Sequence, residues 1–342
     1  MITERFAAQL LTGPPAASPE EVTGRLLAVQ AQDPRGARLA IRPRSAGLTA
    51  ADVDRALNEG ALLITWLNRR TLHLVRREDY WWLHALTTPP LATGNARRLA
   101  QEGVTPEAAD RAVAVIERSL AAEGPLTRPQ LRDRIAAAGV RTEGQALVHE
   151  LELASLRGIT VRGPMAGREH AFVLVRDWLG PPRPFDRSQA LAELARRFLV
   201  GHGPAGERDL AKWAGLPLRD ARAGLTAIGT ELIQRPDGLA DLADLAALAG
   251  QRDHRVPPPR LLGAFDPLLH GWVNREPILG ATQGIITVNG IFRPFALVEG
   301  RAVGTWTMPD GVVELDRLAE LTDAVEEALA AEAADVRRFL GL

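Results

Sequence analysis

Cysteine is absent from this sequence of 342 residues. Disulfide bonds, thiolate catalysis and cysteine-bound zinc or iron–sulfur sites are therefore excluded. Long apolar runs are absent as well, since no stretch approaches the roughly eighteen consecutive apolar residues that a membrane-spanning helix needs. The first residues, MITERFAAQLL, lack the basic-then-apolar layout of a signal peptide. We therefore expect a cytoplasmic protein that makes no contact with a membrane.

Motifs for metals, nucleotides and imine chemistry are also missing. The seven histidines show neither His-x-x-x-His nor His-Glu-x-x-His spacing, and there is no phosphate-binding loop of the Walker type. We therefore expect neither a metal nor a cofactor. Lys212 is the only lysine, and it falls on the solvated face of a predicted helix. Because an imine requires an amine nucleophile, the sequence predicts no catalysis through a lysine imine.

Charge is nearly balanced over the whole chain but is unevenly distributed. The net charge is -1. Residues 35–98 contain eleven arginines and five acids, whereas residues 310–342 contain nine acids and three arginines. The N-terminal part is therefore a candidate phosphate-binding surface. A simpler interpretation is that arginine is abundant because of genome composition, since all basic residues except Lys212 are arginines.

The stretch from Leu26 to Arg44, LLAVQAQDPRGARLAIRPR, places two glutamines at a joint between two predicted helices. A residue before a proline is pushed out of the α region, so the first helix should end by Asp33. Asp33 is then expected to cap a second helix that starts at Pro34. The side chains of Gln30 and Gln32 share a face only in extended backbone. We therefore expect the helix to unwind there, so that two amides point to one spot.

Predicted helices predominate along the chain, and short hairpins follow them, as in a winged helix. The first hairpin spans residues 62–77, with its turn at Asn68-Arg69-Arg70. Two Gly-Pro pairs, at Gly124 and Gly203, lie about one domain length apart, and a leucine follows each glycine by seven positions, which indicates duplication. The sequence thus predicts a mainly α fold with small β-hairpins (α+β). We expect three tandem winged-helix domains, over residues 1–95, 96–180 and 185–342.

The last predicted domain is expected to carry two additions, a three-stranded meander over residues 285–306 and a terminal helix over residues 315–340. The third helix of each domain, which reads the major groove in a standard winged helix, carries no basic row. Residues 49–59 include three acids and one arginine, and residues 217–230 are mostly small or apolar. This argues against a sequence-specific repressor and favours modules that line a concave surface of the size of DNA.

Three segments resemble the winged-helix DNA glycosylases of the AlkZ type. The first, QAQDPRGARLAIRPR, carries the Gln-apolar-Gln signature of that family. The second is TWLNRRTLHLV, from Thr65 to Val75, and the third is AFDPLLHGW, followed by the strand set that ends in GRAVGTW. The segments occur in the family's order, and the resemblance extends over nearly the whole chain. The family usually has Arg-Gly before Thr-Leu-His, whereas this chain has Arg69-Arg70.

The resemblance implies a monofunctional DNA glycosylase that hydrolyses the N-glycosidic bond of alkylated purines in DNA repair and leaves an abasic site. An N7-alkylated purine is positively charged and leaves as a neutral base, so no general acid is needed. What remains is to position water and to stabilise an oxocarbenium-like transition state. The family's glutamine pair has this role and maps onto Gln30 and Gln32. The alternative is that Gln30, four residues after Leu26, only ties helices together.

Four further residues are candidates for the pocket. Asp33 is the second choice for a base, although its capping position already explains it. Asp266, in AFDPLLHGW, is likewise placed to cap a helix before Pro267, and His270 could reach the same cleft. His73 lies inside the first predicted hairpin and is more simply explained as a buried strand histidine.

Five arginines of the basic stretch are candidates for contacts with DNA phosphates. They are Arg35, Arg38, Arg42, Arg69 and Arg70. The expected partner is double-stranded DNA that contains N7-alkylguanine, a bulky adduct or an interstrand crosslink, bound by a monomer in a concave cleft. The resemblance also allows a role in antibiotic self-resistance. The alternative from another class is a non-catalytic winged-helix DNA-binding or regulatory protein, and release of free base from alkylated DNA separates the two.

Overall fold

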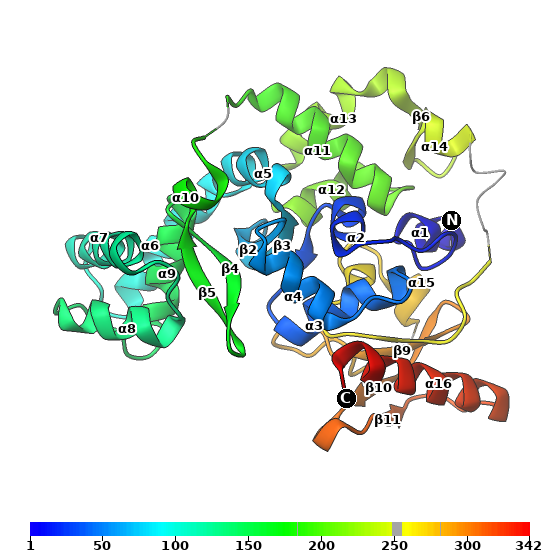
Figure 1. Ribbon diagram of the computed structural model, residues 1–342. Coiled ribbons are helices and arrows are strands. Elements are labelled where there is room, and N and C mark those ends of the chain that lie inside the picture. Colours follow the sequence, from blue (N-terminus) through cyan, green and yellow to red (C-terminus); the bar gives the residue numbers. More distant parts are fainter. Residues whose placement is uncertain (183, 248–254, 281) are drawn as a thin grey trace. The chain divides into compact units, whose positions relative to one another are not determined.

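The computed structural model describes residues 1–182, 184–247, 255–280 and 282–342 (Figure 1). The chain divides into two units. Unit 1 comprises Met1–Val53 and Leu191–Leu342, and unit 2 comprises Asp54–Ala190. Helices dominate both units, and short strands pair within each of them, which confirms the mixed, mainly helical composition predicted from the sequence. No described helix is long and apolar enough to cross a membrane.

Unit 1 is built from both ends of the sequence. Its helices are α1 (Ile2–Ala8), α2 (Pro19–Leu26), α3 (Pro34–Ile41), α12 (Glu207–Ala214), α13 (Leu218–Ala227), α14 (Ala243–Ala247), α15 (Glu276–Leu279) and α16 (Asp323–Leu340). Its strands are β1 (Val29–Gln30), β6 (Leu232–Gln234), β7 (Ala240–Leu242), β8 (Arg260–Leu262), β9 (Phe295–Val298), β10 (Arg301–Thr307) and β11 (Glu314–Arg317). Helices α4 (Ala50–Asn58) and α11 (Arg187–His202) cross the unit boundaries in sequence.

The larger sheet of unit 1 has the strand order β11-β10-β9-β8, and its pairs are antiparallel. The β9–β10 turn uses Glu299 and Gly300, with φ of 49° and 77°, as the tight turn of a right-twisted hairpin requires. The indole of Trp306 on β10 donates a hydrogen bond of 2.9 Å to the carbonyl of Leu262. Helix α16 packs against β8, so the C-terminal helix forms a second layer against this sheet.

Unit 2 carries its own antiparallel sheet, in the order β3-β2-β4-β5. Its strands are β2 (Leu62–Leu67), β3 (Thr71–Arg76), β4 (Thr160–Ala166) and β5 (Glu169–Leu174). Its helices are α5 (Tyr80–Thr87), α6 (Ala92–Gln101), α7 (Pro106–Glu123), α8 (Arg128–Ala137), α9 (Ala146–Leu156) and α10 (Val175–Leu179). The hairpin predicted over residues 62–77 is therefore confirmed, with Leu67 paired to Thr71 next to its turn.

The two Gly-Pro pairs occupy equivalent places in the two units. In unit 2, Leu126 follows Pro125 and forms a backbone bridge with Phe172 on β5, and α8 begins two residues later. In unit 1, Ala205 follows Pro204 and bridges Ala240 on β7, and α12 likewise begins two residues later. Each bridge ties the start of a helix to a hairpin. The repeat detected in the sequence thus corresponds to a repeated local structure.

Two expectations for the C-terminal part were wrong. Residues 285–288 form no strand, and only a single bridge joins Ile286 to Phe292; the partner of β9 on that side is β8, which comes from earlier in the chain. Residues 315–317, expected to begin the terminal helix, belong instead to β11, which pairs with β10. The helix starts only after Thr322, whose hydroxyl caps it. The N-capping residue therefore starts this helix later in the chain than the apolar spacing suggested.

Candidate active site around Gln30 and Gln32

The glutamine motif lies in non-helical backbone of unit 1. Helix α2 ends at Leu26, and Leu27 adopts φ 66° and ψ -44°, a conformation that stops a helix. Gln30 lies in the extended segment β1, and Gln32 is also outside any helix. The unwinding predicted from Asp33-Pro34 is confirmed, but it begins several residues earlier than expected.

The two amides differ in their surroundings. The side chain of Gln30 is 7% exposed, and the intervening Ala31 is 3% exposed. Gln32, in contrast, is exposed to solvent. One amide is therefore held inside the protein while the other reaches the surface. This arrangement gives the pair one fixed and one accessible polar group at the same joint.

Asp33 caps helix α3, as the sequence predicted. Its backbone is extended, with φ -107° and ψ 115°, and Pro34 is the first helical residue. The carboxylate oxygen Oδ1 accepts a 2.6 Å hydrogen bond from the backbone N–H of Gly36, which satisfies one orphan donor of the helix N-terminus. Capping therefore accounts for the residue type at this position and fixes where the non-helical glutamine segment meets α3.

Helix α3 is seated directly on the segment AFDPLLHGW. A Cβ atom on Gly36 would lie only 2.4 Å from the carbonyl oxygen of Ala264, and one on Gly263 would lie 2.8 Å from Cβ of Leu39. Only glycine allows two backbones to approach so closely. The late segment that resembles the glycosylase family thus supports the first turn of α3, immediately after the glutamine motif.

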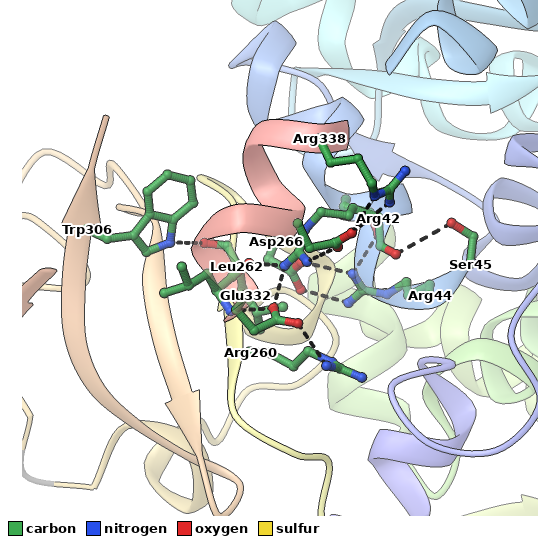
Figure 2. A network of polar contacts seen from close by, with 12 residues as sticks. Arg42, Arg44, Ser45, Arg260, Leu262, Asp266, Trp306, Glu332 and Arg338 are labelled. Carbon is green, nitrogen blue, oxygen red and sulfur yellow. Dashed lines mark hydrogen bonds and ion pairs between the residues drawn. The ribbon is translucent and has the colours of Figure 1, made fainter. Parts of the chain in front are cut away.

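Asp266 belongs to this support and does not line an open pocket. Its side chain and that of Arg44 are both 0% exposed and form a bidentate ion pair with distances of 2.9 and 2.7 Å. Asp266 also accepts the backbone N–H of Leu268 at 2.9 Å, and Arg44 donates to the carbonyl of Gln9. Figure 2 shows the pair inside a network of polar contacts. With its oxygens engaged and no exposure, Asp266 has a structural role.

Arg42 is a second arginine with an internal role. Its guanidinium donates to Glu332, to Asp335 and to the carbonyl of Leu261, each at 2.7 Å. Glu332 also pairs with Arg260 at 2.8 Å (Figure 2). The side chain of Arg42 is only 2% exposed. A contact between Arg42 and a DNA phosphate, as expected from the sequence, would have to break these bonds, so we assign Arg42 to the joint between α3, β8 and α16.

Arg70 is also engaged inside its own unit. It takes a positive φ of 64° where the family usually has glycine. Its guanidinium forms a bidentate pair with the buried Glu152 on α9, with one contact at 2.7 Å, and it contacts Nδ1 of His149 at 3.2 Å. The carboxylate of Glu152 therefore compensates the positive charge of Arg70 that was expected to contact a DNA phosphate. The expectation that Arg70 binds a phosphate therefore loses its basis.

Three candidate arginines remain near or at the surface. Arg35 is exposed on the first turn of α3, and Arg69 is half-buried in the β2–β3 turn. Arg38 is 9% exposed and donates a 2.8 Å hydrogen bond to the carbonyl of Pro34, so only its outer edge reaches solvent. Arg35 and Arg69 are the members of the predicted set whose exposure suits a phosphate contact.

The two candidate histidines are packed among other groups. His73 on β3 is 2% exposed, and its Nδ1 donates to the carbonyl of Thr71 at 2.9 Å. Burial, with a smaller contribution from the charge of Arg69, lowers the pKa of His73 to about 3, so it is neutral at neutral pH. His270 is half-buried, with its ring 4.2 Å from the ring of Phe292. His73 therefore supplies no protonated acid.

Comparison with known proteins decides the family. The model of the AlkZ-like DNA glycosylases matches residues 23–339. The chain belongs to this family. It is therefore a DNA glycosylase, as the glutamine motif and the two later segments had indicated.

Relatives of known function or structure support this assignment. The chain is 27% identical, over 99% of its length and 95% of the relative's, to an interstrand DNA cross-link repair glycosylase of Streptomyces sahachiroi. The solved structure of the DNA glycosylase AlkZ from the same organism has the same fold, with a TM-score of 0.78 and 24% identity. That match covers 100% of this chain and 96% of the solved one.

The acids that bind the interior arginines were missed from the sequence. Glu332 and Glu152 bind two of the arginines expected to contact DNA, and they lie 290 and 82 positions away from Arg42 and Arg70. Local patterns carry no information on such pairs. The only available signal was that a glutamate on the inner face of a predicted helix requires a partner.

Proposed function

We propose that this DNA glycosylase is monofunctional and releases alkylated purines, including N7-alkylguanine and bulky or cross-linked purines, from double-stranded DNA. The observation that carries the proposal is the non-helical backbone at Gln30–Gln32, immediately before the capped start of α3. It presents two amides without a helix between them. The relative named for interstrand cross-link repair supports the bulky end of this substrate range.

In the proposed mechanism the two amide oxygens orient a water molecule at the sugar carbon. The alkylated base is already cationic and departs as a neutral molecule, so protonation of the leaving group is unnecessary. The amides also stabilise the positive charge that develops on the sugar. Gln30, which is buried, fixes the geometry, and Gln32, which is exposed, faces the incoming substrate. Asp33 holds the joint by capping α3.

The division into three winged-helix domains, over residues 1–95, 96–180 and 185–342, is part of the same proposal. It is supported by the repeated order of helix, Gly-Pro bridge, two helices and hairpin in the second and third segments. A concave surface that binds DNA, action as a monomer, and Arg35 and Arg69 as phosphate contacts complete it.

Base release from alkylated DNA tests the proposal. Gln30→Ala and Gln32→Ala should each lower the single-turnover rate of base release by about tenfold or more, the scale of one transition-state hydrogen bond, while binding to undamaged duplex stays within about twofold. Gln189→Ala, an exposed glutamine at the start of α11, is the matched control and should be unchanged. Wild-type rates in both test variants would show that the glutamine pair is not the catalytic centre.

A further inference from the structure

Arg162 is placed between two aromatic rings on the sheet of unit 2. It lies on β4, opposite Phe172 on β5 and opposite Ile64 on β2. Its guanidinium carbon is 4.8 Å from the ring centroid of Trp66 and 5.0 Å from that of Phe172. Trp66 is two residues from Ile64 on the same strand and therefore on the same face. The two rings fix the plane of the guanidinium.

No acid compensates the charge of Arg162. Among the described residues its side chain makes no hydrogen bond or ion pair, and its Nε is buried without a partner. The side chain as a whole is half-buried, and its terminal nitrogens are not among the buried unpartnered atoms, so they reach the surface. This distinguishes Arg162 from Arg42, Arg44 and Arg70, each of which binds a carboxylate.

A second positive charge stands close to Arg162. The backbone of Leu126 bridges Phe172 with hydrogen bonds of 3.1 and 2.7 Å, which brings the start of α8 beside β5. Arg128, the first residue of α8, is exposed and has no acidic partner among the described residues. Burial, followed by repulsion from Arg128, lowers the pKa of Arg162 to about 10. Both side chains remain cationic at neutral pH, so the protein holds two like charges together without an anion.

We propose that Arg162 and Arg128 form a binding site for a backbone phosphate of DNA. A planar guanidinium presents a fork of N–H donors that matches two phosphate oxygens. Stacking between rings fixes this fork before binding, so little side-chain entropy is lost. A phosphate also removes the repulsion between the two arginines. The proposal rests on duplex DNA as the substrate and is independent of the role given to Gln30 and Gln32.

The surroundings favour a phosphate over a nucleobase. Phe172 is 0% exposed and Trp66 is 5% exposed, so neither ring offers a free face on which a base could stack. Only the charged edge of Arg162 is accessible. The site is therefore expected to contribute to affinity for any sequence and to carry no information on the base.

Salt-dependent binding of an undamaged duplex tests the site. Each phosphate contact removed should lower the slope of log affinity against log salt by about one unit and weaken binding roughly three- to tenfold at about 0.1 M salt. We expect this loss in Arg162→Gln and in Arg128→Ala. Arg132→Ala is the matched control, because it removes the same charge from the same helix but Arg132 is paired with Asp133 at 2.9 Å. Its slope should not change.

Thermal unfolding of each variant separates binding from folding. If Arg162→Gln is poorly folded, Arg128→Ala decides the question, since Arg128 is exposed to solvent. Unchanged slopes in folded Arg162→Gln and Arg128→Ala would overturn the proposal and leave Arg162 a purely structural residue. The glutamine mechanism is tested by base release and not by this binding, so failure of one proposal leaves the other intact.

Discussion

Glu150 shows what a single unpartnered carboxylate does inside this protein. It lies on α9 and is 0% exposed, and neither carboxylate oxygen has a hydrogen-bond partner. Burial, with a smaller contribution from the charge of Glu143, raises its pKa to about 7. Since the pKa in the unfolded chain is about 4.5, the folded state binds the extra proton between these two values. The contribution of Glu150 to stability is therefore complete below pH 4.5 and is lost as the pH rises through 7.

Glu150→Gln should remove this pH dependence. The amide stays neutral, so the free energy of unfolding of the variant relative to wild type should rise between pH 4.5 and pH 8. The rise is at most about 3 kcal/mol, at ~1.4 kcal/mol for each unit of pKa. Denaturant unfolding at several pH values measures it. Glu169→Gln, at an exposed position, provides the control, and parallel curves for the two variants would contradict the buried, unpartnered state of Glu150.

At the scale of elements, the contact between α3 and the segment before Asp266 should affect both stability and the proposed catalytic step. Gly36→Ala places a methyl group 2.4 Å from the carbonyl oxygen of Ala264, a separation that forces the first turn of α3 to shift. We expect a loss of about 1–3 kcal/mol in unfolding free energy. We also expect slower base release, because Gln32 and Asp33 join this turn directly.

Gly229→Ala is the matched control for this prediction. A Cβ atom there meets nothing within 4 Å, so its melting temperature and excision rate should equal those of wild type. If Gly36→Ala behaves like Gly229→Ala in both measurements, α3 is not seated on Ala264 as described. If stability falls but the single-turnover rate of base release does not, the contact between α3 and Ala264 contributes to folding alone.

Which elements could be predicted from the sequence follows from the range of the forces involved. Asp33-Pro34 marked the start of α3, and the Asn68-Arg69-Arg70 turn marked the first hairpin, because capping and turn preferences act within a few residues. The end of α2 could not be found in this way. It depends on Leu27, a fully buried residue with a positive φ, a conformation that the residue type does not predict.

The candidate site shows the same division. The position of Gln30 and Gln32 at a joint was readable from local signals, and the resemblance supplied their role. The ion-pair partners of Asp266 and Arg42 could not be predicted from the sequence, since Arg44 is 222 positions from Asp266 and Glu332 is 290 positions from Arg42. Such pairs exist only once the sheet and helices of unit 1 are assembled. An arginine count along the chain therefore overstates the charge available to DNA.

Over the whole molecule, almost every cationic side chain is an arginine, and this limits the chemistry that we expect of the enzyme. All basic residues but Lys212 are arginines, and arginine is not deprotonated at neutral pH. Arginine therefore serves ion pairs and phosphate contacts but not nucleophilic attack. Primary amines for an imine are confined to Lys212, which is exposed in the last turn of α12, and the amine of Met1, which pairs with Glu4 at 2.9 Å.

The enzyme should therefore stop at the abasic site. Strand cleavage by a glycosylase requires an amine to attack the opened sugar, and the lone lysine occupies a regular helix, outside the Gln30–Gln32 joint. On a duplex that contains N7-methylguanine, we expect free base in solution and strand breaks only after alkali or heat. Borohydride added during the reaction should leave no protein bound covalently to DNA.

Lys212→Ala gives this prediction its sharpest form. The variant should release base at the wild-type rate, because no step of the proposed hydrolysis uses an amine and water is the nucleophile. Strand breaks without alkali in the wild-type reaction, together with a borohydride-trapped complex that Lys212→Ala abolishes, would place the reacting sugar at α12. The non-helical glutamine segment would then be a structural joint, and the centre of the chemistry would lie among residues that follow Gly206.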